Sequence, residues 1–323
     1  MKYIVSTNDD VYFNLALEEY IFNNLKDNSY FMLWKNHDSI VLGKHQNVFE
    51  EINIKAIEKD NIKVARRITG GGTVFHDRGN LNYSFITAYD KNKFIDYDQF
   101  ITPVIEALNT IGVKAEKRRT SDIAIEGKKI SGSAQTVKGN RALHHGTLLY
   151  DADLYMLNHL LKTTDGKIES KSVKSVPSIV TNIKDHLGDK SMTIDQFQDL
   201  LLATMFSKGI EKFEITDQHI EAVNELVENK YSKWEWNYGN SPDFSYEKKS
   251  LAFSKPIDVK LTVKKGIIHS CAIKGKDFPC NDMEESLSGT IYSYNLVKDK
   301  LLKCNSLKNI KNINYDELAN CFF

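Results

Sequence analysis

The chain has 323 residues, of which 41% are hydrophobic and 27% are charged, a composition typical of a soluble globular protein that buries a large core. Lysine plus arginine and aspartate plus glutamate both total 43, so a generally basic surface that would coat nucleic acid is not expected. No stretch approaches the ~18 consecutive apolar residues of a membrane span, and acidic residues come too early for a signal peptide. We therefore expect a cytoplasmic protein that has neither nucleic acid nor a membrane as a partner.

The cysteines indicate neither a disulfide framework nor a zinc site. None of the four forms a Cys-x-x-Cys pair, and all lie in the last fifth of the chain, as Cys271, Cys280, Cys304 and Cys321. The first 270 residues therefore contain no thiol nucleophile.

The N-terminal region predicts a helix that ends near Leu25. Residues 7–10 supply N-cap candidates, and apolar residues recur every four positions as a buried stripe of Phe13, Leu17, Ile21 and Leu25. Two acidic residues in the middle of this helix, Glu18 and Glu19, are expected on its solvated face. The short apolar runs 30–34 and 39–42 predict a hairpin-like pair of strands.

The most distinctive stretch runs from Arg66 to Asp77 and reads Arg-Arg-Ile-Thr-Gly-Gly-Gly-Thr-Val-Phe-His-Asp. Glycine N–H groups can face a phosphate without a Cβ in the way, and arginine adds a fork of donors suited to phosphate or carboxylate. No Lys-Ser/Thr pair follows and the spacing is not G-x-G-x-x-G, so neither a P-loop nor a dinucleotide site is indicated. A bare glycine triplet is more often a flexible turn, but Arg67, His76 and Asp77 beside it favour a binding loop between two strands.

Further along, the pattern alternates between helices and strands. We expect a strand over 81–88, a helix over 97–111 with Gly112 at its C-cap, an antiparallel meander over 121–149, and helices over 153–161, 193–207 and 219–228. The polar segment 161–190 is expected to be a mobile loop. Turn-forming residues at 239–242 mark a boundary, after which a hairpin over 257–273 and helices over 283–287, 294–302 and 315–322 predict a small α+β unit.

The meander carries two further motifs, Lys128-Lys129-Ile130-Ser131-Gly132-Ser133-Ala134-Gln135 and His144-His145-Gly146-Thr147-Leu148-Leu149. A strand lysine before small residues can present its ammonium to a cleft, although a single such lysine is more often a solvated charge. Adjacent histidines on a strand point to opposite faces, so they do not predict a metal centre.

Taken in order, R-R-x-T-G-G-G-x-V-x-H-D-x-G-N, K-I-S-G-S-A and H-H-G-T-L-L resemble the motifs of the lipoate–protein ligase family, within the larger biotin/lipoate ligase group. The resemblance begins at the helix that contains residues 14–19 and runs through Leu149. It implies an α+β fold, in which a large domain with a mixed, mainly antiparallel sheet flanked by helices is followed by a small C-terminal α+β domain. We expect a catalytic lipoate/ATP-binding domain over 1–241 and an accessory domain over 242–323.

The resemblance also implies an activity: ATP activates lipoate as lipoyl-AMP, and the lipoyl group then passes to a lysine of an acceptor protein. The implied acceptors are lipoyl domains of 2-oxoacid dehydrogenase complexes or the glycine-cleavage H protein. Carried over by motif position, Lys129 would be the catalytic residue that bridges the lipoate carboxylate and the α-phosphate. The nucleotide would be held by Arg67 and by the backbone of Gly72, Thr73, Val74 and Phe75. Asp122 is the candidate contact for the adenylate or for Mg²⁺.

The acyl tail of lipoate requires an apolar tunnel. The expected lipoate-contacting residues, besides Lys129, are Leu17, Trp34, Leu42, Gly71, His76 and His145. Ordinary core packing would also explain the apolar members of this set, and structural hydrogen bonds alone would explain Glu18 and His76.

One departure concerns the nucleotide. Family members usually carry Arg-Asn-Asp where this chain has Thr120-Ser121-Asp122. Ser121 can replace one hydrogen bond of the asparagine to the adenylate but not the whole amide, so we expect weaker nucleotide binding rather than lost chemistry.

Three alternatives stay open. An octanoyl or lipoyl transferase of the same fold would need a cysteine to form its acyl-thioester, and the motif region has none. A biotin ligase would carry a Gly-Arg-Gly-Arg-rich loop, which is absent from this sequence. Ser121 leaves open a third alternative, a lipoate-binding module with impaired adenylation, whereas Arg67, Lys129 and the complete glycine loop argue against it.

Overall fold

The computed structural model describes residues 1–90, 96–161, 166–276, 278–310 and 313–323, and the chain forms two compact units. The larger unit consists of Met1–Lys44, Lys63–Leu157 and Val176–Lys233. The smaller unit consists of His45–Ile62, Asn158–Ser175 and Trp234–Phe323. Two earlier segments of the chain, 45–62 and 158–175, therefore complete the unit that the C-terminal region builds.

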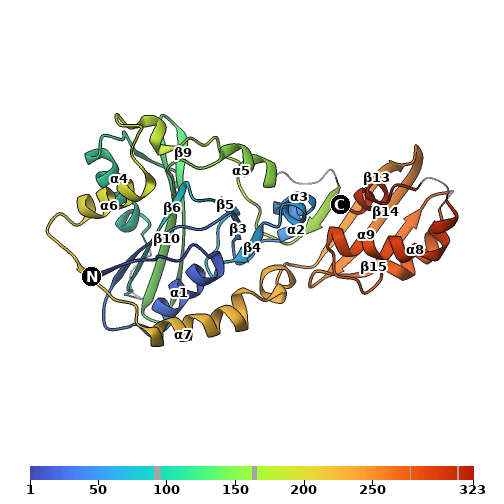
Figure 1. The fold of residues 1–323 in the computed structure, drawn as a ribbon, viewed down its shortest axis with the longest axis horizontal. Coiled ribbons are helices and arrows are strands. Elements are labelled where there is room, and N and C mark those ends of the chain that lie inside the picture. The colour runs from blue at the N-terminus through green and yellow to red at the C-terminus, as the bar shows by residue number, and fades with distance from the viewer. Residues whose placement is uncertain (91–95, 162–165, 277, 311–312) are drawn as a thin grey trace. The chain divides into compact units, whose positions relative to one another are not determined.

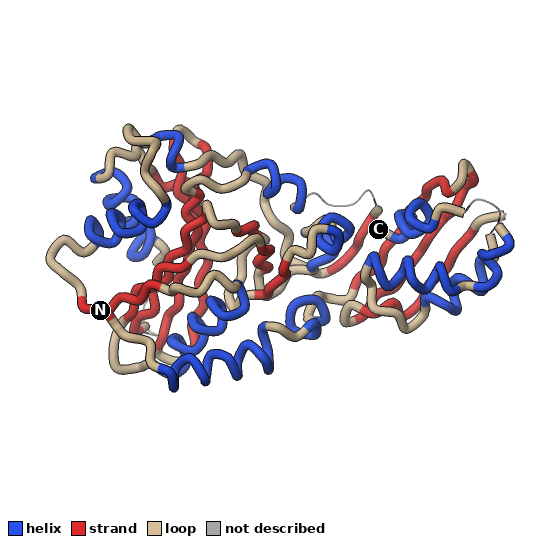
Figure 2. Tube along the Cα trace, viewed as in Figure 1, coloured by secondary structure: helices blue, strands red, loops and turns tan. Residues whose placement is uncertain are grey.

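A mixed eight-stranded sheet forms the centre of the larger unit (Figures 1 and 2). The strand β1 pairs in parallel with β12 and β2, and the other neighbours pair antiparallel, which confirms the predicted mixed, mainly antiparallel sheet. In spatial order the strands are β12 (Glu211–Lys212), β1 (Lys2–Val5), β2 (Tyr30–Trp34), β6 (Asn80–Ala88), β10 (Arg141–Leu149), β9 (Lys128–Lys138), β8 (Asp122–Ile125) and β7 (Glu116–Arg118).

A second sheet of three strands carries the glycine-rich loop. Its members are β4 (Lys63–Arg66), β3 (Ser39–Leu42) and β5 (Val74–His76), and the loop joins β4 to β5 as predicted. The predicted hairpin between residues 30–34 and 39–42 is wrong, because β2 pairs with β1 and β6 whereas β3 pairs with β4 and β5. Both strands are buried along their whole length, so their continuous apolar runs match central strands of two sheets better than one exposed hairpin.

Helices cover both faces of the large sheet (Figure 1). On one face lie α4 (Asp98–Thr110) and α6 (Ile194–Met205), and on the other lie α1 (Val11–Asn24) and α7 (Asp217–Leu226). The larger unit also contains η1 (Ile183–His186), η2 (Val227–Tyr231) and the first half of α5 (Leu154–Leu160). Each predicted helix of this region is present within a few residues, and side chains cap several of their N-termini, as Asp10 does for α1.

The main hydrophobic core lies between the sheet and the α4/α6 layer. Aromatic residues of β2 and β6 meet helix residues there, with Phe31 and Phe85 from the sheet and Phe100 and Phe197 from the helices. On the other face, α1 is buried more widely than the predicted stripe, since Asn14 and Glu18 join Leu17 and Ile21 among its buried residues. This second face positions the polar site described below.

The smaller unit contains a four-stranded antiparallel sheet with the order β11 (Lys167–Ser170), β13 (Phe244–Ala252), β14 (Lys255–Lys264) and β15 (Ile267–Lys274). The predicted hairpin and C-terminal helices are confirmed. Residues 167–170 were expected within a mobile loop and instead form a paired strand, while residues 162–165 of that loop lie outside the described residues. The helical segments are α2 (Val48–Glu51), α3 (Ile54–Lys59), η3 (Glu235–Gly239), α8 (Cys280–Leu287), α9 (Tyr294–Lys303), η4 (Asn305–Asn309), α10 (Tyr315–Ala319) and η5 (Asn320–Phe322).

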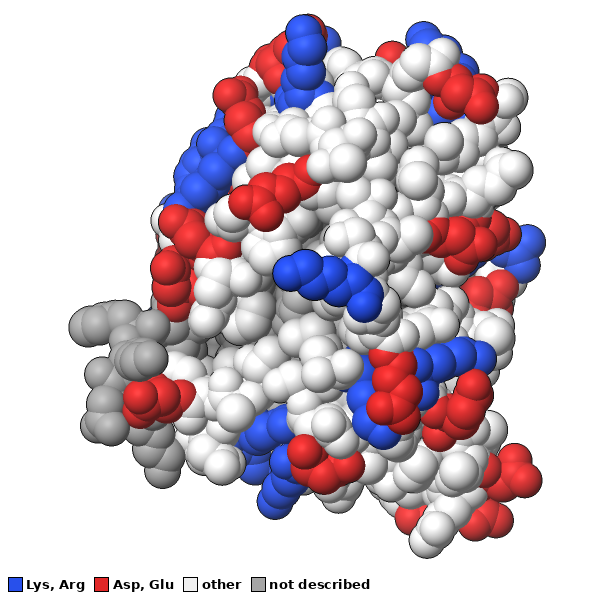
Figure 3. Space-filling model, turned by 90° about the vertical axis from the view of Figure 1, so that its left-hand side faces the viewer, with Lys and Arg blue, Asp and Glu red and all other residues white. Residues whose placement is uncertain are grey.

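The surface carries charges of both signs. On the face shown in Figure 3, Lys and Arg are interspersed with Asp and Glu and no field of a single sign extends across it. Among the described helices, none is both long enough and apolar enough to span a bilayer.

Candidate active site

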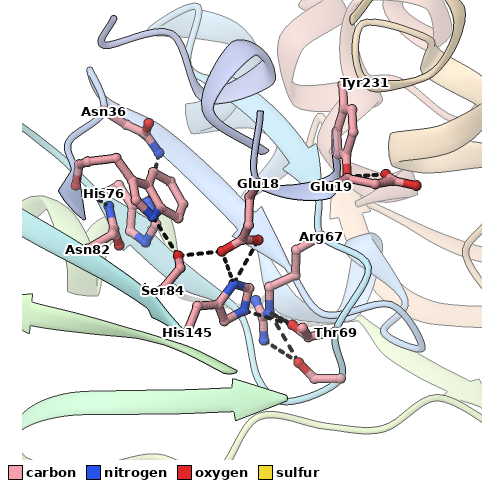
Figure 4. Close-up of polar contacts among 12 residues, drawn as sticks. Glu18, Glu19, Asn36, Arg67, Thr69, His76, Asn82, Ser84, His145 and Tyr231 are labelled. Carbon is pink, nitrogen blue, oxygen red and sulfur yellow. Dashed lines mark hydrogen bonds and ion pairs between the residues drawn. The ribbon is translucent and has the colours of Figure 1, made fainter. Parts of the chain in front are cut away.

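The glycine-rich loop is organised by one buried arginine. Arg67 is 6% exposed, and its Nη2 donates to the carbonyl oxygens of Gly70 and Gly72 at 2.6 and 2.7 Å. Its Nη1 donates to the carbonyl of Val41 at 3.0 Å, and its Nε donates to Thr69 Oγ1 at 3.0 Å. These bonds hold the loop in its shape, as Figure 4 shows. Burial lowers the pKa of Arg67 to about 10, so the guanidinium stays charged at neutral pH.

Gly71 is the one residue of the triplet with a left-handed backbone, at φ +85°. A Cβ at this position would lie 2.9 Å from Arg67 Nη2 and 3.4 Å from the Cβ of Ala134 on β9. The loop therefore needs a glycine here for its conformation and for its close approach to the arginine. The same contact places the exposed tip of the loop against strand β9.

Lys129 lies on the same strand. Its Nζ is 2.9 Å from Asp122 Oδ1, with the lysine side chain 25% exposed and that of Asp122 6% exposed. The ammonium lies over Gly132, where an added Cβ would be 2.7 Å from Nζ and 2.8 Å from Cε. Backbone bonds to the segment 179–181 fix the lysine, since Lys129 N donates to Ile179 O at 2.8 Å and Lys129 O accepts from Thr181 N at 3.1 Å.

The glycine loop and the Lys129 ammonium therefore share one face of β9. Gly132 and Ala134 are two residues apart on the strand, so they point to the same face, about 7 Å apart along it. Gly132 lies under the lysine and Ala134 lies against Gly71. The structure thus brings together the two motifs that the sequence separates by more than fifty residues.

A buried hydrogen-bond chain lies on this same face of the sheet (Figure 4). His145, which pairs with Ala134 in the β9–β10 ladder, contacts Glu18 Oε1 through Nδ1 at 2.9 Å and Thr69 Oγ1 through Nε2 at 2.8 Å. Glu18 also accepts from Ser84 Oγ at 2.6 Å. The chain therefore runs from helix α1 through His145 to the threonine that holds Arg67.

The expectation that Glu18 lies on a solvated face is wrong. Its side chain is 1% exposed because α1 lies on the sheet at this point, and donors from β6 and β10 offset the cost of burying a carboxylate. The neighbouring Glu19 is also partly covered, and it accepts from Tyr231 Oη at 2.6 Å and from Lys230 Nζ at 2.5 Å.

His76 and Trp34 lie beside this hydrogen-bond chain, since Trp34 Nε1 donates to Ser84 Oγ at 2.9 Å. Asn36 Nδ2 lies 2.9 Å from His76 Nδ1, and Asn36 Oδ1 accepts from Asn14 Nδ2 at 2.9 Å, which fixes the direction of the Asn36 amide. The proton of His76 is then on Nε2, which is buried and has no partner among the described residues. Burial, with the nearby charges of Arg67 and His145, lowers the pKa of His76 to about 3. The imidazole is therefore a neutral donor beside the Trp34 ring, at a centroid distance of 5.9 Å.

His144 belongs to the opposite face of β10. Its ring stacks on Phe100 at a centroid distance of 4.7 Å, within the α4 side of the sheet, and burial lowers its pKa to about 3. Of the two adjacent histidines, it is His145 that meets the loop.

The other predicted residues are dispersed around this centre. Leu17 on α1 and Leu42 on β3 are buried, as are Thr73 and Phe75, while Val74 and Gly72 are half-buried. The Ser121 carbonyl accepts from the N–H and Oγ of Ser133, at 2.8 and 3.0 Å. Sequence reasoning missed Thr69, Ser84 and Asn36 as supports of the site. The spacing of Asn14 and Glu18, four residues apart on one helix face, was the available signal for a polar site on α1.

One carboxylate in this centre suits a nucleotide-bound cation. Mg²⁺ is typically held by one or two carboxylates together with substrate phosphates and water, and Asp122 provides one buried carboxylate next to Lys129. Within the described ranges, no group of three or more His, Cys, Asp or Glu side chains forms a dedicated metal cage. The donor set therefore fits a cation that arrives with its substrate.

Comparisons with known proteins agree with this geometry. Residues 10–206 match the lipoyl protein ligase A/B catalytic domain, and residues 241–322 match the bacterial lipoate protein ligase C-terminus. Lipoate–protein ligase 1 of Staphylococcus aureus is 39% identical over 93% of this chain and 93% of its own length. Lipoate-protein ligase LplJ of Bacillus subtilis is 38% identical over 98% of this chain and 97% of its own.

Solved structures give the same result. A lipoate-protein ligase A bound with ATP superposes with a TM-score of 0.62 at 28% identity, over 74% of this chain and 98% of the other. A putative lipoate protein ligase from Thermoplasma acidophilum with bound lipoic acid has a TM-score of 0.62 at 27% identity over the same shares. A bi-partite ligase from that organism, described with its E2 lipoyl domain, has 0.62 at 26%, over 74% and 96%. The chain therefore belongs to the lipoate–protein ligase family of enzymes.

Proposed function

We propose that the site on β9 joins lipoate to AMP and then passes the lipoyl group to a lysine of an acceptor domain. The observation that carries this proposal is the shared strand face, on which the Lys129 ammonium lies over Gly132 and the glycine loop lies against Ala134. The ligase bound with ATP and the one bound with lipoic acid support ATP and lipoate as the substrates of this chain.

In the first step, a lipoate carboxylate oxygen attacks the α-phosphorus of ATP. The bond from that phosphorus to the bridging oxygen breaks, and pyrophosphate leaves. Both reactants are anions, so the site must offset their repulsion. The ammonium of Lys129 bridges the carboxylate and the α-phosphate, and the N–H groups of Gly72, Thr73, Val74 and Phe75 face the phosphates. Arg67 supports this step by holding the loop carbonyls, so that the amide groups stay in place.

Asp122 has two tasks in this proposal. It orients Lys129 through the 2.9 Å ion pair, and it is the carboxylate that would hold Mg²⁺ when the nucleotide brings it. The ion supplies charge neutralisation on the phosphates. The Ser121 side chain, where relatives usually have asparagine, supplies at most one hydrogen bond to the adenylate.

The acyl tail lies between α1 and the sheet. Leu17 and Trp34 provide apolar walls, and both are buried. The Nε2–H of His76, which meets no acceptor in the described part of the chain, donates toward the ligand, and Gly71 together with His145 closes the carboxylate end. Apolar walls together with a few polar donors suit an apolar chain that ends in an acid.

In the second step, the amine of an acceptor lysine attacks the carbonyl carbon of lipoyl-AMP, AMP leaves, and the nitrogen releases a proton to solvent. Lys129 polarises the carbonyl and stabilises the oxyanion. The relative described with its E2 lipoyl domain supports a lipoyl domain of a 2-oxoacid dehydrogenase complex as the acceptor, and the glycine-cleavage H protein is the second candidate. We also propose that residues 1–241 act as the catalytic domain and 242–323 as an accessory domain, which the C-terminal family match from 241 supports.

Two measurements test this function. Lipoate-dependent ATP–pyrophosphate exchange reports the first step, and mass spectrometry of the candidate acceptors, after incubation with ATP, Mg²⁺ and either lipoate or octanoate, reports the second. We expect exchange and a lipoyl mass increase on the acceptor lysine. Lipoate binding without exchange would instead favour a binding module, and acyl transfer without ATP would favour a transferase.

A further inference from the structure

Neither the sequence motifs nor the comparisons assign a role to Arg118. It ends strand β7 and pairs directly with Asp122 across the β7–β8 ladder. Side chains that lie opposite one another in an antiparallel ladder share a face, with their Cβ atoms about 5 Å apart. The face that carries Asp122 is the one that carries Lys129 and Gly132, since the Asp122 carboxylate contacts Lys129 and lies near Gly132. Arg118 is therefore a second cation at the same corner.

The position of Arg118 is fixed by the hairpin. The Ser121 carbonyl in the β7–β8 turn accepts two hydrogen bonds from Ser133 of β9, so the turn is anchored to the strand that carries Lys129. Arg119 adopts a left-handed φ of 55° and is exposed. Of the two adjacent arginines, only Arg118 lies in the ladder with Asp122.

One N–H-bearing nitrogen of the Arg118 guanidinium makes no hydrogen bond with the described residues. This nitrogen, Nη1, is shielded from solvent. Asp122 is paired with Lys129 instead. A shielded guanidinium nitrogen without an acceptor is costly, and the corner keeps one positive charge beyond the Lys129–Asp122 pair. This arrangement suits an anionic ligand that brings its own acceptors.

We infer that Arg118 is a nucleotide-binding residue, whose Nη1–H donates to a non-bridging phosphate oxygen of ATP and of the adenylate. The inference rests on the proposed function for the identity of the nucleotide. Relatives usually carry an arginine at the position of Thr120, in the β7–β8 turn. In this chain the positive charge at this corner comes instead from Arg118, at the end of β7 and four positions before Asp122.

The test compares Arg118→Gln with Arg119→Gln, which removes the same charge from the exposed neighbour. Loss of a charge-assisted hydrogen bond predicts a KM for ATP raised about tenfold or more in pyrophosphate exchange, with the KM for lipoate changed less than about twofold. Arg118→Lys keeps the charge and should recover part of the loss, and it serves as the informative variant if Arg118→Gln does not fold. Arg119→Gln should behave like the wild type.

Direct binding of α,β-methylene-ATP, measured by calorimetry, separates this inference from the proposed function. Weaker binding by Arg118→Gln supports the inference even if the wild type shows no exchange, in which case only the proposed function fails. A Kd within about twofold of the wild-type value, or an equal loss for Arg118→Gln and Arg119→Gln, overturns the inference.

Discussion

Substitution of Gly132 by alanine should lower the rate of adenylation while leaving the stability of the fold almost unchanged. A Cβ there would lie 2.7 Å from Lys129 Nζ and 2.8 Å from Cε, against about 3.5 Å for an unstrained contact. The ammonium must therefore move by about 0.8 Å, away from the position at which it meets Asp122. A misplacement of about 1 Å at a reacting centre can cost about a hundredfold in rate. We expect Gly132→Ala to lower kcat/KM for adenylation by about that factor, or about 2.7 kcal/mol.

The fold should tolerate this substitution. The atoms that a methyl group would meet are the end of a flexible side chain, and Gly132 is not among the residues with positive φ. The melting temperature should stay within a few degrees of the wild type. Gly188→Ala is the matched control, because a Cβ there meets nothing within 4 Å. Exchange activity within about threefold of wild type for Gly132→Ala would refute the placement of Lys129, since a displaced ammonium could not leave adenylation intact.

Lys129→Ala should abolish lipoate-dependent exchange while the circular dichroism spectrum is retained, because the side chain contributes charge rather than core packing; near-normal exchange contradicts its assigned role. Glu18→Gln should lower the free energy of unfolding in urea by about 1–3 kcal/mol, since it removes the negative charge and places an amide NH2 where Oε2 lies 3.0 Å from His145 Nδ1; equal stability would show that the buried charge is dispensable. Burial lowers the pKa of His76 and His144 to about 3 from 6.5, so both are neutral in the fold and take up protons when the chain unfolds below pH 6.5. Stability should therefore fall as the pH drops from 6.5 toward 3, by about 2 kcal/mol per histidine at pH 5. His144→Phe should remove about half of that loss in denaturation curves at pH 5 and 7, and an unchanged pH dependence would argue against a buried neutral imidazole.

The glycine loop shows how far local reasoning reaches. The residue types of Arg66–Asp77 predicted a loop between two strands, which the structure confirms, whereas anion binding by that loop stays a prediction. The partners of Arg67 could not be predicted. Its donors reach Val41, a strand neighbour that is twenty-six residues away, and side-chain reach across a sheet depends on which strands pair.

Periodicity and turn chemistry in the sequence by themselves determined the helices, most of the strands and the motif order, because these signals act over a few residues. Only the tertiary structure decided that residues 30–34 and 39–42 belong to different sheets, that Glu18 is buried against two polar partners, and that residues 45–62 and 158–175 belong with the C-terminal unit. The physical reason is that the periodicity of apolar residues shows which side chains share a face of a helix or strand, but not which other element packs against that face. The partner is set by burial of the whole chain, where a carboxylate such as Glu18 is tolerated only because distant donors arrive to meet it.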